Sequence, residues 1–113
     1  MRVLIADDDR QVSRWLLRVL KIMGHSAEAV EDGEELLRRV PTFAPDVVVS
    51  DIGLPGCDGI RAGLRLRAEY PELPVVLMTG DPTRAEEARR AGFAPVLDKP
   101  FALDELSAAL SSF

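Results

Sequence analysis

Five short apolar stretches, each followed by a polar segment, constrain this fold more than any other feature of the sequence. The run from Val47 to Ser50 is almost purely β-branched and stops at Asp51, before a segment rich in glycine and proline. Such a run is typical of a strand buried on both faces that ends in a loop. Four more strands are expected at residues 2–6, 26–30, 74–78 and 95–98.

Amphipathic segments separate these strands and predict five helices. The helices are expected over residues 10–23, over 34–40 with Pro41 and Pro45 closing the second, from 60 to a stop at Tyr70-Pro71, over 82–92, and over 103–110. Apolar residues at helical spacing are expected to face the core; these are Val12, Trp15, Leu16, Val19, Leu20 and Met23 in the first helix and Ile60, Leu64 and Leu66 in the third. Strands alternating with helices predict an α/β fold, a single domain over residues 1–113, with a doubly wound five-stranded parallel sheet and helices on both faces.

Composition narrows the class of protein. The chain has 113 residues and a net charge of −5, so it lacks the basic footprint of a protein that binds DNA or RNA directly. Its apolar runs are far shorter than a membrane span, and no signal peptide precedes the first strand. The single cysteine, Cys57, has no chemical role assigned and is compatible with a reducing compartment, so we expect a cytoplasmic protein.

The residues that end the strands predict a site. In a parallel sheet all carboxyl ends meet at one edge, which brings together Asp7 and Asp8, Asp51, Thr79 and Lys99. Clustered carboxylates repel one another unless a cation is bound, and an all-oxygen ligand set selects Mg²⁺ or Mn²⁺ over zinc. Asp51, alone on the central strand, is the candidate nucleophile for phosphoryl transfer, while Lys99 offers a positive charge and Thr79 a hydroxyl.

These motifs resemble the receiver domain of two-component response regulators over essentially the whole chain. The resemblance rests on the acid pair Asp7-Asp8, the D-x-x-x-P-x-x-D-G segment from Asp51 to Gly59, Thr79-Gly80, and Lys99-Pro100-Phe101. It implies the flavodoxin-like strand order 2-1-3-4-5 and Mg²⁺-dependent transfer of a phosphoryl group from a phosphohistidine to Asp51 for signal transduction.

The resemblance also implies roles for individual residues. Asp8 would bind Mg²⁺ directly with Asp7 assisting, and the Gly53 carbonyl would complete the metal shell. The Lys99 ammonium, the Thr79 hydroxyl and the Gly80 amide would hold phosphoryl oxygens. Asp9 is better explained as an N-cap and Asp58-Gly59 as the turn before the third helix, while Lys99-Pro100 is a candidate cis peptide.

Partners follow from the same resemblance. A sensor histidine kinase or phosphotransfer protein would supply the phosphoryl group, and an effector domain or protein would receive the signal. The basic face of the first helix, with Arg14, Leu17 and Arg18, is either a solvated surface or the surface that docks the kinase. A dimer through the fourth helix, fifth strand and fifth helix is a further expectation, and the only chemistry expected is the domain's own phosphorylation and dephosphorylation.

The sequence departs from the family pattern at Val96, where most receivers carry a Tyr or Phe that turns inward on activation. Phe93 and Phe101 lie nearby but are expected to be core or ordinary family positions. Gly53 and Asp81 occupy the two positions that tune phosphoaspartate hydrolysis in the family. The rotamer switch at residue 96 is therefore expected to be absent.

Other functions remain to be weighed. A receiver-like binding module that works without phosphate is favoured only by Val96. A phosphatase of the haloacid dehalogenase type would want a second Asp where Gly53 stands, and a flavin-binding domain would want glycines and donors where the first loop is acidic.

Overall fold

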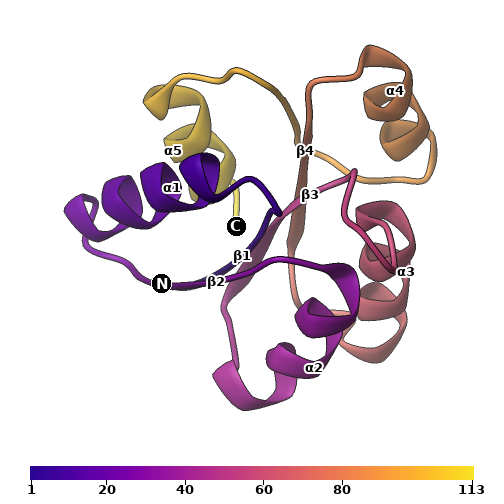
Figure 1. The fold of residues 1–113 in the computed structure, drawn as a ribbon, viewed down its shortest axis with the longest axis horizontal. Coiled ribbons are helices and arrows are strands. Elements are labelled where there is room, and N and C mark those ends of the chain that lie inside the picture. Colours follow the sequence, from indigo (N-terminus) through magenta and orange to yellow (C-terminus); the bar gives the residue numbers. More distant parts are fainter.

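The computed structural model describes residues 1–113 and contains one five-stranded sheet flanked by five helices (Figure 1). The strands are β1 Arg2–Ala6, β2 Ser26–Val30, β3 Val47–Asp51, β4 Val75–Thr79 and β5 Val96–Asp98. The helices are α1 Arg10–Ile22, α2 Gly33–Phe43, α3 Gly59–Glu69, α4 Pro82–Arg90 and α5 Leu103–Ser111. The alternation predicted from the sequence is confirmed.

The strands are all parallel and lie in the order β2-β1-β3-β4-β5, as the resemblance implied. Strand β3 is central: its Val49 pairs with Ile5 on one side and with Val76 on the other. The first three residues of β3, Val47–Val49, are fully buried, which explains why the run carries no polar side chain before Ser50. The register places Asp51 at the carboxyl end of the central strand, level with Met78 of β4.

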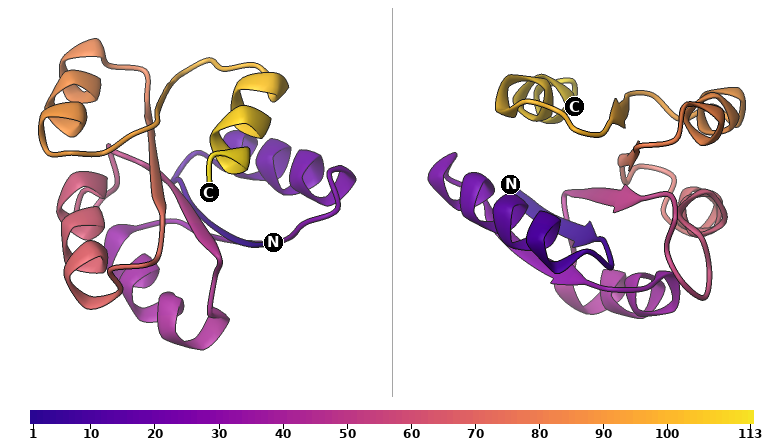
Figure 2. Two further views of the ribbon diagram at one scale, coloured as in Figure 1. Left: turned by 180° about the vertical axis from the view of Figure 1, so that it is seen from behind. Right: turned by 45° about the horizontal axis from the view of Figure 1, so that its top comes forward.

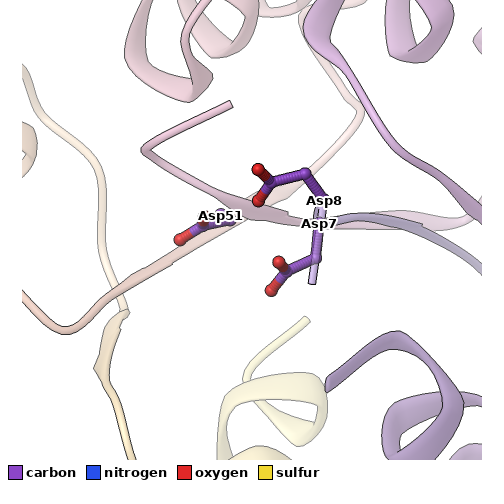
Figure 3. A group of neighbouring side chains, drawn as sticks. All are labelled: Asp7, Asp8 and Asp51. Atoms are coloured by element: carbon purple, nitrogen blue, oxygen red, sulfur yellow. The ribbon is translucent and has the colours of Figure 1, made fainter. Parts of the chain in front are cut away.

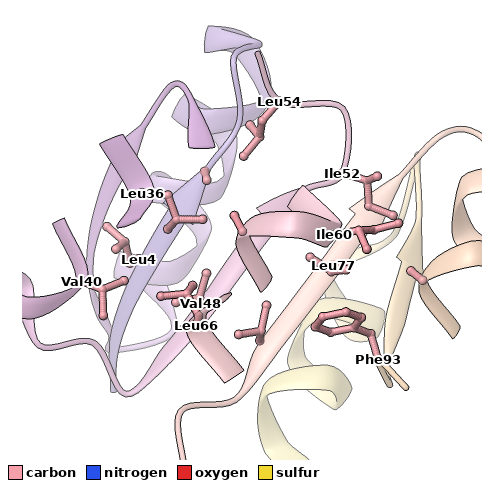
Figure 4. Packing of buried hydrophobic residues seen from close by; sticks show 14 of the residues in the cluster. Leu4, Leu36, Val40, Val48, Ile52, Leu54, Ile60, Leu66, Leu77 and Phe93 are labelled. Atoms are coloured by element: carbon pink, nitrogen blue, oxygen red, sulfur yellow. The ribbon is translucent and has the colours of Figure 1, made fainter. Parts of the chain in front are cut away.

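Helices cover both faces of the sheet (Figures 1 and 2). On one face α1 and α5 lie together and bury Leu16, Leu20 and Leu106 against the strands. On the other face α2, α3 and α4 cover a larger apolar cluster that includes Leu36 and Leu66 (Figure 4). Because helices cover both faces of the sheet, polar side chains can gather only where the strands end, at the carboxyl or the amino edge of the sheet.

Aspartates begin four of the helices. Asp9, Asp32, Asp58 and Asp81 are the N-caps of α1, α2, α3 and α4, and each side chain accepts a hydrogen bond from one or two main-chain amides of the first turn. A cap of this kind stabilises a helix by about 1 kcal/mol. The expected structural roles of Asp9 and Asp58 are thereby confirmed.

The predicted end of the second helix is wrong. Helix α2 includes Pro41 and continues to Phe43, where Ala44 ends it with a left-handed backbone. Phe43 is 4% exposed and lies under the Arg2 guanidinium, 4.1 Å from the ring centroid, and Arg2 also donates to the Phe43 carbonyl. Burial of this aromatic ring offsets the hydrogen bond that proline cannot donate.

Two apolar residues assigned to the core are partly in solvent. Trp15 is 39% exposed on α1 and Leu64 is 44% exposed on α3. On α1 the position facing the strands is instead Ser13, which is 8% exposed and shares the inner face with Leu16. Trp15 packs edge-on against Phe101 with ring centroids 5.8 Å apart, so it covers the gap between α1 and the loop before α5.

Helix α4 has the smallest buried side chains of the five. Only Ala85 and Ala88 of α4 are buried, whereas α3 buries Ile60 and Leu66. Arg67 of α3 helps to hold the end of α4, because it donates to the Ala91 and Gly92 carbonyls at 3.0 and 3.2 Å. None of the helices has the length and apolar character needed to cross a membrane.

Candidate functional site

Three carboxylates meet at the carboxyl edge of the sheet. Asp7 and Asp8 directly follow β1 and Asp51 ends β3, so adjacent strands deliver them to the same place. One oxygen atom from each lies within 4.8 Å of the others (Figure 3). The predicted convergence of these acids is therefore present in the fold.

Asp7 is the buried and fixed member of the group, at 1% exposure. Its main-chain amide donates to the Val30 carbonyl at 3.1 Å. One carboxylate oxygen accepts from the Asp9 amide at 2.9 Å and the other from the Lys99 ammonium at 2.7 Å. Asp7 thus has a partner for each carboxylate oxygen without any metal ion.

Asp8 is exposed, and its carboxylate takes part in no hydrogen bond or ion pair of this structure. Its oxygens are therefore free to bind a cation at the mouth of the site. This contrast with Asp7 fits the expected division between a direct ligand and an assisting acid.

Asp51 is partly buried, with 14% of its side chain exposed, and Lys99 lies 3.3 Å from its Oδ1 atom. Burial raises the pKa of Asp51; the Lys99 charge lowers it in part, while the charges of Asp7 and Asp8 add to the increase. Ionisation of Asp51 therefore costs more free energy in the folded protein than in the unfolded chain.

Lys99 connects the acids of β1 and β3. Burial alone would lower the pKa of Lys99, but the hydrogen bonds and charges of Asp7 and Asp51 outweigh it, so the pKa is raised. The side chain therefore stays cationic at neutral pH and is 22% exposed, toward the mouth of the site. The Lys99–Pro100 peptide is cis, as the resemblance implied, and so is Ala94–Pro95.

Thr79 and Gly80 form the third side of the site. Thr79 is 6% exposed, and its hydroxyl oxygen accepts a hydrogen bond from the Asp81 amide at 3.1 Å. The Thr79 carbonyl accepts from the Lys99 amide at 2.8 Å, which ties the ends of β4 and β5 together. Gly80 is exposed beside them.

Gly53 and Asp81 follow the strand ends that carry Asp51 and Thr79. Gly53 is exposed, and a β-carbon added there would lie 3.7 Å from Asp51 Oδ2, so its absence leaves that oxygen open to approach. Asp81 uses one carboxylate oxygen to cap α4 through the Thr83 amide at 2.9 Å. The cap holds Asp81 at the start of α4.

Val96 is 9% exposed and belongs to the apolar cluster under α3 and α4. Phe93 is 1% exposed, and its ring lies where a β-carbon on Gly63 would be only 2.9 Å away, so it is a core residue as expected. Phe101 is half-buried beside Trp15. No aromatic side chain occupies the position of the usual switch.

The residues considered for docking lie on α1, the helix that follows the acid pair. Arg14 and Arg18 are exposed and form no ion pair. Leu17, expected to break the polar stripe, is partly buried and packs against the core cluster between α1 and the sheet. Trp15 and Ile22 are the large apolar residues of α1 that are exposed.

Sequence reasoning missed two buried hydroxyls at the site. The Ser13 hydroxyl donates to the Asp7 carbonyl at 3.2 Å, and the Ser50 hydroxyl donates to the Asp51 carbonyl at 2.9 Å. A signal for Ser13 was present, because residues 13, 16 and 20 fall on one face of a helix and the other two are leucines.

The donor set fits a hard divalent cation. Every candidate ligand is an oxygen, the acids are close enough to share one ion, and burial together with the neighbouring acids raises the pKa of Asp51. The three carboxylates project to the same side in Figure 3, and Lys99 already pairs with Asp7 at 2.7 Å. The arrangement can hold one cation and a small dianion beside it.

Comparisons with known proteins agree with this geometry. Residues 3–111 match the family model of the response regulator receiver domain. The chain is 38% identical over 112 residues to the response regulator MprA of Mycolicibacterium vanbaalenii, covering 97% of this chain and 48% of that protein. The MprA protein of Mycobacterium leprae is also 38% identical, with 49% of its length covered. The chain spans about half the length of these curated relatives.

Solved structures give the same result. A putative response regulator from Chloroflexus aurantiacus has a TM-score of 0.89 and 31% identity, with 98% of this chain and 94% of that chain covered. The receiver domain of NtrX from Brucella abortus has a TM-score of 0.89 and 29% identity, covering 97% of this chain and 95% of that one.

Proposed function

Since this chain belongs to the response regulator receiver family, we propose that it accepts a phosphoryl group on Asp51 from a phosphohistidine of a partner kinase or phosphotransfer protein. The observation that carries the proposal is the position of the Lys99 ammonium, 2.7 Å from Asp7 and 3.3 Å from Asp51. The positive charge of Lys99 is thus held beside Asp51, where the oxygens of an incoming phosphoryl group would lie.

The transfer is a displacement at phosphorus. An Asp51 carboxylate oxygen attacks the phosphorus, the bond from phosphorus to the donor's imidazole nitrogen breaks, and the nitrogen keeps the electron pair. Oδ2 is the favoured nucleophile, because Oδ1 faces Lys99 and Gly53 leaves Oδ2 uncovered. Hydrolysis of the resulting acyl phosphate returns the carboxylate, and we propose no turnover of other substrates.

The same site binds Mg²⁺, or Mn²⁺ in its place, through the carboxylates of Asp8 and Asp51 and the main-chain carbonyl of Gly53, with Asp7 assisting. When bound, the cation neutralises charge on the acids and on the phosphoryl oxygens. Lys99, the Thr79 hydroxyl and the Gly80 amide hold the remaining oxygens. For this Thr79 has to orient its O–H outward, which its bond to Asp81 allows because the hydroxyl oxygen is the acceptor there.

Acetyl phosphate tests the proposal without a partner. Incubation with MgCl₂ and acetyl phosphate should add one phosphoryl group, detected by intact mass, and the adduct should be absent in Asp51→Asn. Asp8→Asn is the matched variant, because it makes the same change from acid to amide at the site. Asp8 is exposed and has no hydrogen bond or ion pair that the substitution would remove from the fold. Equal labelling of wild type and Asp51→Asn would refute the assignment of the nucleophile.

We propose that the kinase docks on the outer face of α1. Support comes from the unpaired, exposed guanidinium groups of Arg14 and Arg18 with the exposed Trp15 on the same helix, while Leu17 contributes from the partly buried side. The double variant Arg14→Glu with Arg18→Glu should slow phosphorylation by the kinase and leave labelling by acetyl phosphate unchanged. Equal slowing with both donors would place these arginines in the chemistry instead.

Output is proposed to pass to an effector domain or protein through the face formed by α4, β5 and α5. Arg89 of α4 and Asp98 of β5 are 3.3 Å apart and both partly exposed, so the same two residues could pair across a two-fold axis in a dimer. Sedimentation with and without acetyl phosphate tests this, and Arg89→Ala should abolish any dimer. The lone cysteine agrees with a proposed cytoplasmic location.

A further inference from the structure

The four buried polar or charged side chains of this protein all lie at the carboxyl edge of the sheet. They are Asp7, Ser13, Ser50 and Thr79. Ser13 is the only one carried by a helix, and it stands on the inner face of α1 with two leucines. A hydroxyl buried in an apolar layer lowers stability unless it is hydrogen-bonded, so its partner indicates its role.

That partner is a main-chain group of the site. The Ser13 hydroxyl donates to the Asp7 carbonyl at 3.2 Å across six residues of sequence. This carbonyl belongs to the planar peptide group that joins Asp7 to Asp8, so its orientation sets the direction in which Asp8 leaves the strand. Ser13 therefore acts on the backbone of the acid pair and touches neither carboxylate.

The two acids depend on this peptide to different degrees. The Asp7 carboxylate is held independently by Lys99 and by the Asp9 amide. The Asp8 carboxylate has no such partner, and repulsion from the other two acids favours its turning toward solvent. Only the backbone keeps Asp8 beside Asp7 and Asp51 before a cation binds.

We propose that Ser13 is a positioning residue for metal binding: its hydroxyl fixes the Asp7–Asp8 peptide and so keeps the Asp8 carboxylate preorganised for Mg²⁺. The inference rests on the proposed function, since it takes Asp8 as a ligand. Partners of this kind behind metal ligands typically contribute about tenfold or more to affinity.

Matched variants isolate the hydroxyl. Ser13→Ala is compared with wild type. Ser13→Val is compared with Ser13→Thr, because threonine has the shape of valine but keeps the hydroxyl. Ser112→Ala is the distant control, because it removes a hydroxyl that donates to the Ala109 carbonyl at 2.6 Å near the C-terminus. The melting temperature of each variant is measured over a series of MgCl₂ concentrations, and the fluorescence of Trp15 follows the same titration.

A merely structural role lowers the melting temperature equally with and without Mg²⁺, whereas a positioning role reduces the increase that Mg²⁺ produces. We expect Ser13→Ala to bind Mg²⁺ about tenfold more weakly than wild type, Ser13→Val about tenfold more weakly than Ser13→Thr, and Ser112→Ala as wild type does. Affinities within about twofold in both pairs would overturn the role of Ser13 alone. A wild-type protein that gains no stability from Mg²⁺ would overturn the proposed function as well.

Discussion

The Lys99 ammonium lies 2.7 Å from a carboxylate oxygen of Asp7, an acid that is only 1% exposed. The lysine thus neutralises the buried acid before any cation or phosphoryl group arrives. Because this pair satisfies Asp7 from inside the fold, Asp51 shares the same lysine at the longer distance of 3.3 Å, and Asp8 is the acid left without a partner.

Replacing Lys99 by Ala should destabilise the metal-free protein. Breaking a fully buried pair costs about 3–5 kcal/mol, and we expect about 2 kcal/mol here because Lys99 is 22% exposed. Urea denaturation in EDTA measures the loss, and MgCl₂ should recover part of it. Arg65→Ala is the control, since its pair with Glu69 is exposed and 4.0 Å long; a loss no larger than that of this control would contradict the role of the Lys99–Asp7 pair.

Asp51→Asn should raise the melting temperature of the metal-free protein at neutral pH. Burial raises the pKa of Asp51, so the folded protein binds more protons than the unfolded one between the two pKa values, and stability falls as pH rises through that window. The advantage of the variant should shrink as pH falls through the raised pKa of folded Asp51 and vanish only below about 4, where the unfolded chain is protonated at this residue as well. Scanning calorimetry in EDTA across this range tests the sign; an advantage that grows in acid would contradict it.

Gly59→Ala should impair both stability and phosphorylation. A β-carbon at residue 59 would lie 2.2 Å from the main-chain oxygen of Asp51 and 2.8 Å from the Ile52 α-carbon, and backbone atoms cannot turn aside as a side chain can. We expect a loss of about 1–3 kcal/mol in urea denaturation and slower labelling by acetyl phosphate, because the backbone that carries Asp51 has to move. Gly53→Ala should leave stability nearly unchanged, since its β-carbon meets only Asp51 Oδ2 at 3.7 Å; equal losses in the two variants would refute the steric argument.

Arg67→Ala should lower stability without affecting phosphorylation. The guanidinium lies 4.0 Å from the Phe93 ring centroid and donates to two carbonyls after α4, so its removal should cost about 1–2 kcal/mol. The stability of Arg67→Lys should fall between those of wild type and Arg67→Ala, because an ammonium lacks the planar fork of donors with which a guanidinium binds both carbonyls. Arg61→Ala, on the same helix and exposed, is the control, and a phosphorylation defect in Arg67→Ala would show that the contact reaches the site.

Most of the fold could be predicted because strands and helices alternate with clear polar boundaries. The acids, Thr79 and Lys99 could be placed together because topology alone brings strand ends to one edge. The Lys99–Asp7 pairing could not be predicted, since several acids lie within reach of the lysine and only packing decides which one is buried. The end of α2 was missed because the burial of Phe43, a tertiary effect, outweighs the local preference of Pro41.

The faces of α1 were harder to assign. Periodicity ranks residues by polarity, so it placed Trp15 in the core and overlooked Ser13. The helix lies so that its small serine faces the Asp7 backbone, and the large ring is accommodated at the periphery against Phe101. Side-chain size and a hydrogen bond to the backbone decided this orientation, and neither is visible in a hydrophobic pattern.

Helix α4 buries only the methyl groups of Ala85 and Ala88 against the sheet, and the neighbouring strand β5 is three residues long. The free energy of a local opening follows the apolar surface that is exposed by it, so amide protons in α4 should exchange with solvent well before those of β3. A weakly anchored helix can change its docked population in response to a small free energy from the proposed phosphorylation site. In a protein with valine at residue 96, such an equilibrium would report the state of Asp51 without any ring having to turn in the core.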